Sequence, residues 1–210
     1  MIIDSLVLGT FETNGYCLRK SENSQNCVII DTGMDDTYLM NFLEENQLNP
    51  VTLVLTHGHI DHIDGINTIR ENFPDIKVYI HKLDADALTD PMKNLSFMSG
   101  GAFTAKPADI LIEDNDIIEQ ADINLQVLHT PGHTPGGISL YSKEDGVVFS
   151  GDALFAESVG RTDFPGGNMN QLIQGIKEKL FVLPDDTKVL PGHGPATTIG
   201  HEKKYNQFLS

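Results

Sequence analysis

The 210-residue sequence predicts an α/β fold in which two β-sheets pack face to face and helices cover their outer faces. A strand-rich opening followed by helix–strand alternation occurs in both halves of the chain. Several of the strands are short, continuous apolar runs, the type that is buried on both faces. The length corresponds to one domain, and no linker-like or low-complexity stretch divides it. We therefore expect a single domain over residues 1–210.

In the first half, β-branched and aromatic runs separated by Asn, Gly and Ser turns predict strands, and apolar residues at helical spacing predict helices. Pro74 ends the second helix, because proline cannot continue a helical hydrogen-bond ladder. The predicted strands are residues 2–8, 16–19, 27–31, 51–55 and 77–80, and the predicted helices are residues 35–47 and 63–73.

Residues 89–108 show no periodicity and contain two Met and two Phe. A connection of that length in a compact domain is usually either functional or disordered. We expect these residues to form either an apolar lid or a packed connector. Beyond it the strand and helix patterns return. We predict strands at residues 123–128, 137–141, 147–149 and 188–190, and helices at residues 170–180 and 202–208.

Composition and charge exclude several classes of function. With 14 Lys and Arg against 30 Asp and Glu, the net charge is −16, which disfavours binding to nucleic acid or to anionic membranes. No run approaches the roughly 18 apolar residues of a membrane span, and the first residues lack a basic leader pattern. We expect a cytoplasmic protein whose two cysteines, Cys17 and Cys27, are reduced and buried in strands.

A dense group of metal-ligand residues follows the predicted strand 51–55. His57 and His59 are two residues apart, so in an extended chain both imidazoles point to the same side. A tight turn would bring Asp61 and His62 to a neighbouring position. Burying three His and one Asp has no evident structural purpose, whereas imidazole and carboxylate together suit Zn, Fe or Mn.

Three more strands end in small residues that present one ligand each: His133, with His129 as an alternative, then Asp152, then His193. Each lies beside glycine, which permits a close approach of the backbone. Together with the dense group they supply seven nitrogen and oxygen ligands and no sulfur.

The HxHxDH pattern with a later His, Asp and His resembles the metallo-β-lactamase superfamily over nearly the whole chain. The resemblance implies a four-layer αββα sandwich that holds two divalent metal ions. It implies that Asp152 bridges the two ions and that His129, His81 and His201 are not ligands. By the same resemblance, the first metal takes His57, His59 and His133, and the second takes Asp61, His62 and His193.

Within the superfamily, the run Gly151-Asp152-Ala153-Leu154-Phe155 and residues 160–167 resemble short bacterial glyoxalase II-like hydrolases. The Gly-Arg-Thr-Asp-Phe core of the second run is also similar to persulfide dioxygenases. Full-length glyoxalase II has a C-terminal helical domain that binds glutathione. Only 17 residues follow His193, so we expect this domain, and the usual recognition of glutathione, to be missing.

The favoured function is therefore a metal-dependent thioesterase acting on small hydroxyacyl thioesters. Two divalent ions, Zn above Fe or Mn, would activate a bridging hydroxide, with Asp61 orienting it and Asp152 joining the ions. Arg161 either grips a substrate carboxylate or forms an ion pair with Asp163. The alternatives are a persulfide dioxygenase with one Fe(II) on His57, His59 and either Asp152 or His133, and a non-enzymatic module whose metals only stabilise the fold.

Overall fold

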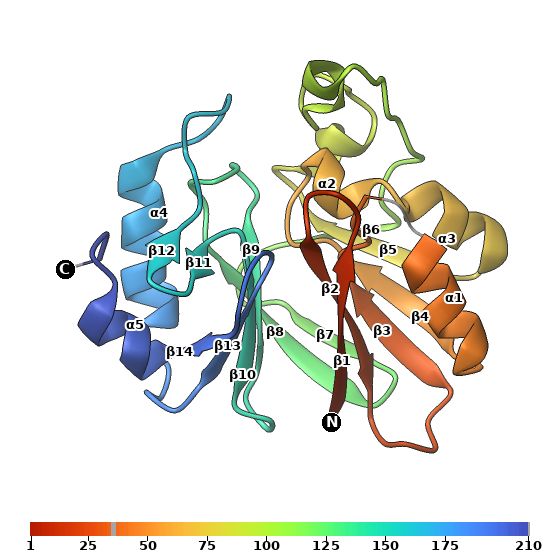
Figure 1. Ribbon diagram of the computed structural model, residues 1–210, viewed down its shortest axis with the longest axis horizontal. Coiled ribbons are helices and arrows are strands. Elements are labelled where there is room, and N and C mark those ends of the chain that lie inside the picture. Colours follow the sequence, from red (N-terminus) through yellow and green to blue (C-terminus); the bar gives the residue numbers. More distant parts are fainter. Residues whose placement is uncertain (35–36, 210) are drawn as a thin grey trace.

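The computed structural model describes residues 1–34 and 37–209 and arranges them in four layers (Figure 1). Two six-stranded sheets face each other. Helices α1 (Thr37–Glu45) and α3 (Ile66–Asn72) cover the outer side of one sheet, and α4 (Met169–Gly175) and α5 (Ile199–Tyr205) cover the outer side of the other. This confirms the αββα sandwich predicted from the sequence.

The first sheet contains the first six strands in chain order. Pairing is antiparallel from β1 to β3 and parallel from β3 to β6, so the helical crossovers lie on one face. The strands are β1 (Ile2–Leu8), β2 (Thr13–Arg19), β3 (Asn26–Ile30), β4 (Asn49–Val54), β5 (Lys77–His81) and β6 (Ile110–Ile112).

The second sheet has the order β14-β13-β10-β9-β8-β7. Strand β9 is antiparallel to both β8 and β10, and β10 is parallel to β13, so β8, β10 and β13 end at the same edge of the sheet. The strands are β7 (Ile117–Gln120), β8 (Ile123–His129), β9 (Ile138–Ser142), β10 (Val147–Gly151), β13 (Lys188–Pro191) and β14 (Thr197–Thr198); β11 (Leu154–Phe155) and β12 (Ser158–Val159) form a separate pair.

Three apolar clusters separate the four layers, and single strands contribute to two of them. On β4, Leu53 packs toward α1 and α3, whereas Val54 packs between the sheets. On β10, Phe149 packs between the sheets and Val148 packs toward α4 and α5. Alternate side chains point to opposite faces of a strand, so a strand buried on both faces needs a continuous apolar run.

The predicted helix at residues 63–73 is wrong in one respect, because the structure divides this region into α2 (Ile60–Ile63) and α3. The break is at Gly65. Its N–H donates to Thr32 Oγ1 at 3.0 Å, and the C=O of His62 accepts from the N–H and the hydroxyl of Thr32. Thr32 thus satisfies backbone groups that a continuous helix would have paired internally. This contact is between distant segments and leaves no local sequence pattern.

Strands β6 and β7 are absent from the sequence prediction. Strand β6 has three residues, too few to show periodicity. Strand β7 pairs with β8 across a two-residue turn in which Ala121 and Asp122 both have positive φ, +48° and +58°. Such turns favour Asn or Gly, so Ala-Asp gives no hairpin signal. The helix predicted over residues 35–47 is observed as Thr37–Glu45, and its predicted start at Asp35 and Asp36 lies outside the described residues.

Residues 89–108 form an irregular connection containing one 3₁₀ turn, η2 (Ser96–Ser99), and they follow another, η1 (Ala85–Leu88). The buried Asn94 amide donates to the C=O of Ala87 at 2.8 Å and of Phe103 at 3.1 Å. The Phe103 side chain packs against the core beneath α1 and α3. By contrast, Met92, Phe97 and Met98 are exposed.

Cys17 and Cys27 are buried and free of disulfides, as predicted. The helix predicted at residues 170–180 is α4, extended by the π-helical turn η3 (Ile176–Leu180). Among the described residues, none of the helices is long and apolar enough to cross a membrane.

Candidate metal centre

The four segments that carry the predicted ligands meet where the two sheets adjoin. One follows β4, and the others follow β8, β10 and β13. Their ligand atoms form three overlapping groups, each with all atoms within 4.8 Å of one another: His57, His59 and His133; His57, His62 and Asp152; and Asp61, His62 and His193. The structure thus brings all seven predicted ligands together.

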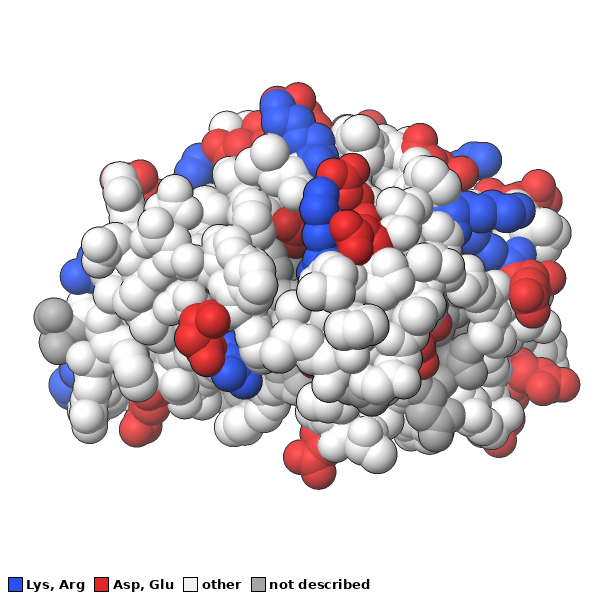
Figure 2. All heavy atoms as spheres, turned by 90° about the horizontal axis from the view of Figure 1, so that it is seen from above, with Lys and Arg blue, Asp and Glu red and all other residues white. Residues whose placement is uncertain are grey.

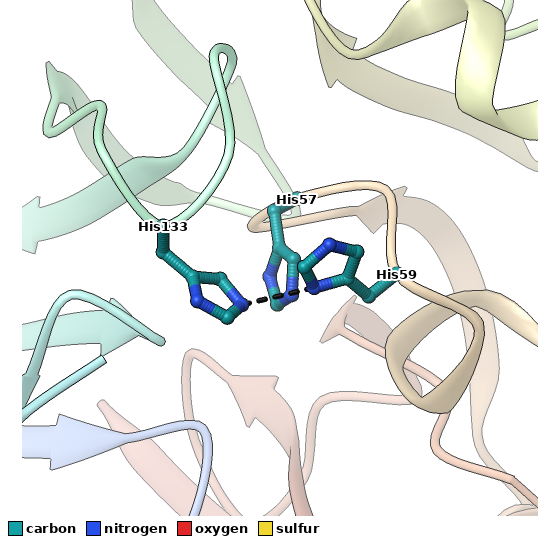
Figure 3. A group of neighbouring side chains, drawn as sticks. All are labelled: His57, His59 and His133. Atoms are coloured by element: carbon teal, nitrogen blue, oxygen red, sulfur yellow. Dashed lines mark hydrogen bonds between the residues drawn. The ribbon is translucent and has the colours of Figure 1, made fainter. Parts of the chain in front are cut away.

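The first group consists of three buried imidazoles. Figure 3 shows His57 and His59 on the segment after β4 and His133 on the loop after β8, with their rings converging on one point. His59 Nδ1 and His133 Nε2 are 2.9 Å apart. The residues are no more than 5% exposed. Such convergence of ring nitrogens is the arrangement that transition-metal ions bind.

Asp61, His62 and His193, which we call the second group, join the start of α2 to the loop after β13. His193 Nε2 lies 3.2 Å from Asp61 Oδ2 and 3.3 Å from His62 Nε2. His193 Nδ1–H donates to the C=O of Phe11 at 3.0 Å, which orients its other nitrogen toward the group.

Asp152 lies between the two groups. Its Oδ1 is 3.4 Å from His62 Nε2, and its Oδ2 is 3.5 Å from His133 Nε2 and 3.6 Å from His193 Nε2. One carboxylate therefore faces ligands of both groups. Five buried side-chain atoms of the described residues have no hydrogen-bond partner: the hydroxyls of Thr13, Thr52 and Thr187, and two ligand atoms, Asp152 Oδ1 and His57 Nε2. Orphaned buried polar atoms are costly unless something else binds them, and a metal ion fits this donor set.

Two imidazoles of the first group, those of His57 and His59, are unprotonated at neutral pH, which favours metal binding. Burial and the neighbouring imidazoles hold the pKa of His57 well below its usual range, and burial together with His133 lowers the pKa of His59 to about 3. Both rings are therefore neutral at pH 7, the form that ligates metals. At Asp152, burial opposes ionisation, but the His62 imidazole outweighs it and holds the pKa below its usual range, so this carboxylate is ionised.

Asp31, which the sequence analysis did not single out, positions His62. Its Oδ2 accepts from His62 Nδ1 at 2.8 Å and from Thr56 Oγ1 at 2.7 Å, and its Oδ1 accepts from the Thr56 N–H at 2.8 Å. The Thr56 hydroxyl in turn lies 3.1 Å from His57 Nδ1. Asp31 thus orients ligands of both groups. A signal existed, because Asp31 ends a buried strand just as Asp152 does.

Asp84 is a second buried carboxylate that the sequence analysis did not single out, and unlike Asp31 it has no sequence signal. It accepts from the N–H of Gly58 at 3.1 Å, from Thr134 Oγ1 at 2.7 Å and from the N–H of Gly136 at 2.6 Å. Gly58 lies between His57 and His59, and Thr134 follows His133. Asp84 therefore ties the two segments of the first group together.

The side chain of Arg161 is exposed and pairs with a neighbouring carboxylate rather than with a ligand residue. Its guanidinium forms two hydrogen bonds of 2.7 Å with Asp163 and stacks 3.9 Å above the Phe164 ring. The ion pair with Asp163 is thus present, and binding of substrate stays a prediction. The Arg161 C=O accepts from His133 Nδ1–H at 2.7 Å, so the backbone of Arg161 orients a ligand.

The remaining histidines lie outside the three ligand groups. His81 stacks on His129 with ring centroids 4.1 Å apart, and His129 Nε2 bonds the C=O of Pro135. His201 pairs with Glu157. Their positions agree with the expectation that none of them is a ligand.

Substituting His193→Ala is expected to reduce the metal content by about one ion per chain, with the fold retained. The second group would lose one of its three ligands, whereas the first would keep three histidines. Elemental analysis and circular dichroism measure both effects, and His201→Ala provides a histidine control outside the centre. An unchanged metal content in His193→Ala would refute the role of His193.

Comparison with known proteins agrees with this geometry. The family model described as "Metallo-beta-lactamase superfamily" matches residues 8–193. The chain is 41% identical to "Probable metallo-hydrolase YqgX" of Bacillus subtilis, over 97% of this chain and 95% of the relative. It is 35% identical to "Hydroxyacylglutathione hydrolase GloC" of Haemophilus influenzae, over 100% of this chain and 99% of the relative.

Two solved structures share the fold over nearly their full length. One, described as "BLEG-1 B3 metallo-beta-lactamase", has a TM-score of 0.94 and 40% identity, with 100% of both chains covered. The other, "TTHA1623 in a di-iron-bound form", has a TM-score of 0.85 and 36% identity, covering 98% of this chain and 100% of that one. A protein with this fold and substantial identity thus holds two metal ions.

Proposed function

This chain belongs to the metallo-β-lactamase superfamily, and on that premise we propose that it is a metal-dependent hydrolase of small thioesters of the hydroxyacylglutathione type. The observation that carries the proposal is the position of Asp152, whose carboxylate faces ligands of two separate groups. A bridging carboxylate suits two metal ions better than one. The similarity to GloC supports a thioester as the substrate.

The predicted ligand residues would bind two metal ions. His57, His59 and His133 would hold one ion, Asp61, His62 and His193 the other, and Asp152 both. Two such ions supply Lewis acidity and a water of lowered pKa. Asp61, whose Oδ2 lies 3.2 Å from His193 Nε2 and whose side chain is 17% exposed, would orient that water. A thiol, with a pKa of about 8.5, leaves as the thiolate and needs no separate general acid.

The experiment that tests this function combines metal analysis with a substrate panel. We expect two ions per chain and turnover of S-lactoylglutathione and related thioesters, with a KM near the upper end of the usual range, ~1 mM. Turnover of β-lactams without thioesters would contradict the proposal. One iron per chain, rapid O2 uptake with glutathione persulfide and no thioester cleavage would instead establish a persulfide dioxygenase.

Arg161→Ala is expected to raise KM about fivefold and to change kcat by less than twofold, because a charge-assisted contact at an exposed site contributes roughly 1 kcal/mol to binding. Since Arg161 pairs with Asp163, Asp163→Asn is the matched variant: it frees the guanidinium and should lower KM. Steady-state kinetics on both variants decide the role. An unchanged KM in Arg161→Ala would show that the Arg161 side chain forms the ion pair with Asp163 but does not bind substrate.

A further inference from the structure

A groove of about 530 Å³ opens beside the first ligand group. Gly58 and His59 are among its lining residues, so it borders a metal-ligand segment. Leu83, Met92, Pro135 and Pro165 contribute its walls. The volume lies within the range of small-molecule sites, about 300–1,000 Å³. A molecule that reacts at the metal centre could therefore extend part of itself into this groove.

Much of the lining of the groove is apolar although it faces solvent. Leu83 is 55% exposed and Met92 is 60% exposed. These side chains come from the segments after β5 and within residues 89–108, and the two prolines come from the loops after β8 and after β12. Single exposed apolar residues are ordinary, but apolar residues from four segments around one groove indicate a binding surface.

The charged groups that line the groove already have partners in this chain. Asp84 is bonded by Gly58, Thr134 and Gly136. Lys93 Nζ lies 2.6 Å from Asp86 Oδ2, and Asp90 Oδ1 accepts from the Met92 N–H at 2.9 Å. The ammonium is thus neutralised locally, and the carboxylates would repel an anion. The groove therefore offers little to an anionic group of a substrate.

The surrounding surface leads to the same conclusion. Figure 2, which looks down on the molecule from the top of Figure 1, shows blue residues mostly beside red ones and broad uncharged areas between them. No extended basic patch is visible on this face. With a net charge of −16, a polyanionic carrier would gain little electrostatic attraction.

We propose that this groove binds an apolar arm of the substrate, so that the preferred thioesters carry an aliphatic or aromatic chain of several carbons. The inference rests on the proposed thioesterase function, whose substrate class it specifies. The arm could belong to the acyl group or to the thiol. Both share the same chemistry, and the test distinguishes them.

The first test lengthens each side of the substrate separately. Acyl thioesters of N-acetylcysteamine from acetyl to octanoyl extend the acyl side, and lactoyl thioesters of alkanethiols extend the thiol side. We expect kcat/KM to rise about two- to threefold per methylene in one series, somewhat less than the roughly fourfold of complete burial. The series that rises identifies the arm, and a flat response in both would overturn the proposal.

The matched variants are Met92→Ser and Met98→Ser. Both remove an exposed methionine from the 89–108 segment, but only Met92 lines the groove. We expect Met92→Ser, alone or with Leu83→Ser, to reduce the dependence on chain length at least twofold, and Met98→Ser to leave it unchanged. Equal effects of Met92→Ser and Met98→Ser would refute the assignment of the groove.

A binding measurement separates this proposal from the proposed function. Calorimetric titration of the metal-loaded protein with acetate, hexanoate and octanoate should show affinity rising with chain length, and the rise should be lost in Leu83→Ser/Met92→Ser. If no thioester is cleaved but this chain-length dependence is found, the thioesterase function is refuted, whereas the proposal that the groove binds an apolar chain is supported. If thioesters are cleaved but affinity does not depend on chain length, the groove proposal fails.

Discussion

Asp152→Ala is expected to lose bound metal and activity together, with kcat/KM reduced at least about 1,000-fold, or ~4 kcal/mol of transition-state stabilisation. The reason is the position of the carboxylate. Its two oxygens lie 3.4–3.6 Å from nitrogens of both ligand groups, so its loss would leave two cations close together without the negative charge between them. Metal content after dialysis and steady-state kinetics measure the two losses.

Asp185→Ala is a suitable control for Asp152→Ala. Asp185 is exposed and pairs with Lys203, and neither residue belongs to a ligand group, so we expect its removal to leave metal content and activity unchanged. If the activity of Asp152→Ala is within about threefold of wild type, a difference in activation free energy of less than ~0.7 kcal/mol, then Asp152 does not bridge the two ions.

Asp31→Ala is expected to lower the free energy of unfolding by about 3 kcal/mol or more, because three buried donors lose their acceptor and each unsatisfied donor costs about 1–3 kcal/mol. Asp31 is 1% exposed and His62 is fully buried. Without the carboxylate, His62 Nδ1 and two donors of Thr56 lose their acceptor. We also expect metal affinity at the second group to fall 10–100-fold, since the orientation of His62 is no longer held. Denaturant unfolding and metal titration measure these effects.

The backbone at Asp31 complicates the alanine variant, because its φ of +56° is unfavourable for most residues. Asparagine tolerates this conformation, so Asp31→Asn removes the charge while keeping the shape and the backbone geometry. We expect Asp31→Asn to be less destabilised than Asp31→Ala but to retain the loss of metal affinity. Wild-type affinity for both ions in Asp31→Asn would show that Asp31 only stabilises the fold.

Much of the fold followed from local patterns. Runs such as residues 51–55 are apolar at every position except Thr52 because the strand is buried on both faces. Helices were predicted where α1 and α4 lie, and α5 begins three residues earlier than the predicted helix at 202–208. The errors lie where a distant contact decided the structure. Thr32 ends α2 by bonding its released backbone groups, and the turn at Ala121 and Asp122 closes a hairpin with residues that rarely occupy such positions.

The sequence by itself determined the ligand types and the strand ends that present them, because both are properties of neighbouring residues. Only the tertiary structure decided which ligands meet. His59 contacts His133, 74 residues later, and His62 contacts His193, 131 residues later. It also decided that Asp31 and Asp84 hold the ligand segments in place and that four segments form an apolar groove. These distances depend on how two sheets pack and where parallel strands end, and no local pattern in the chain encodes them.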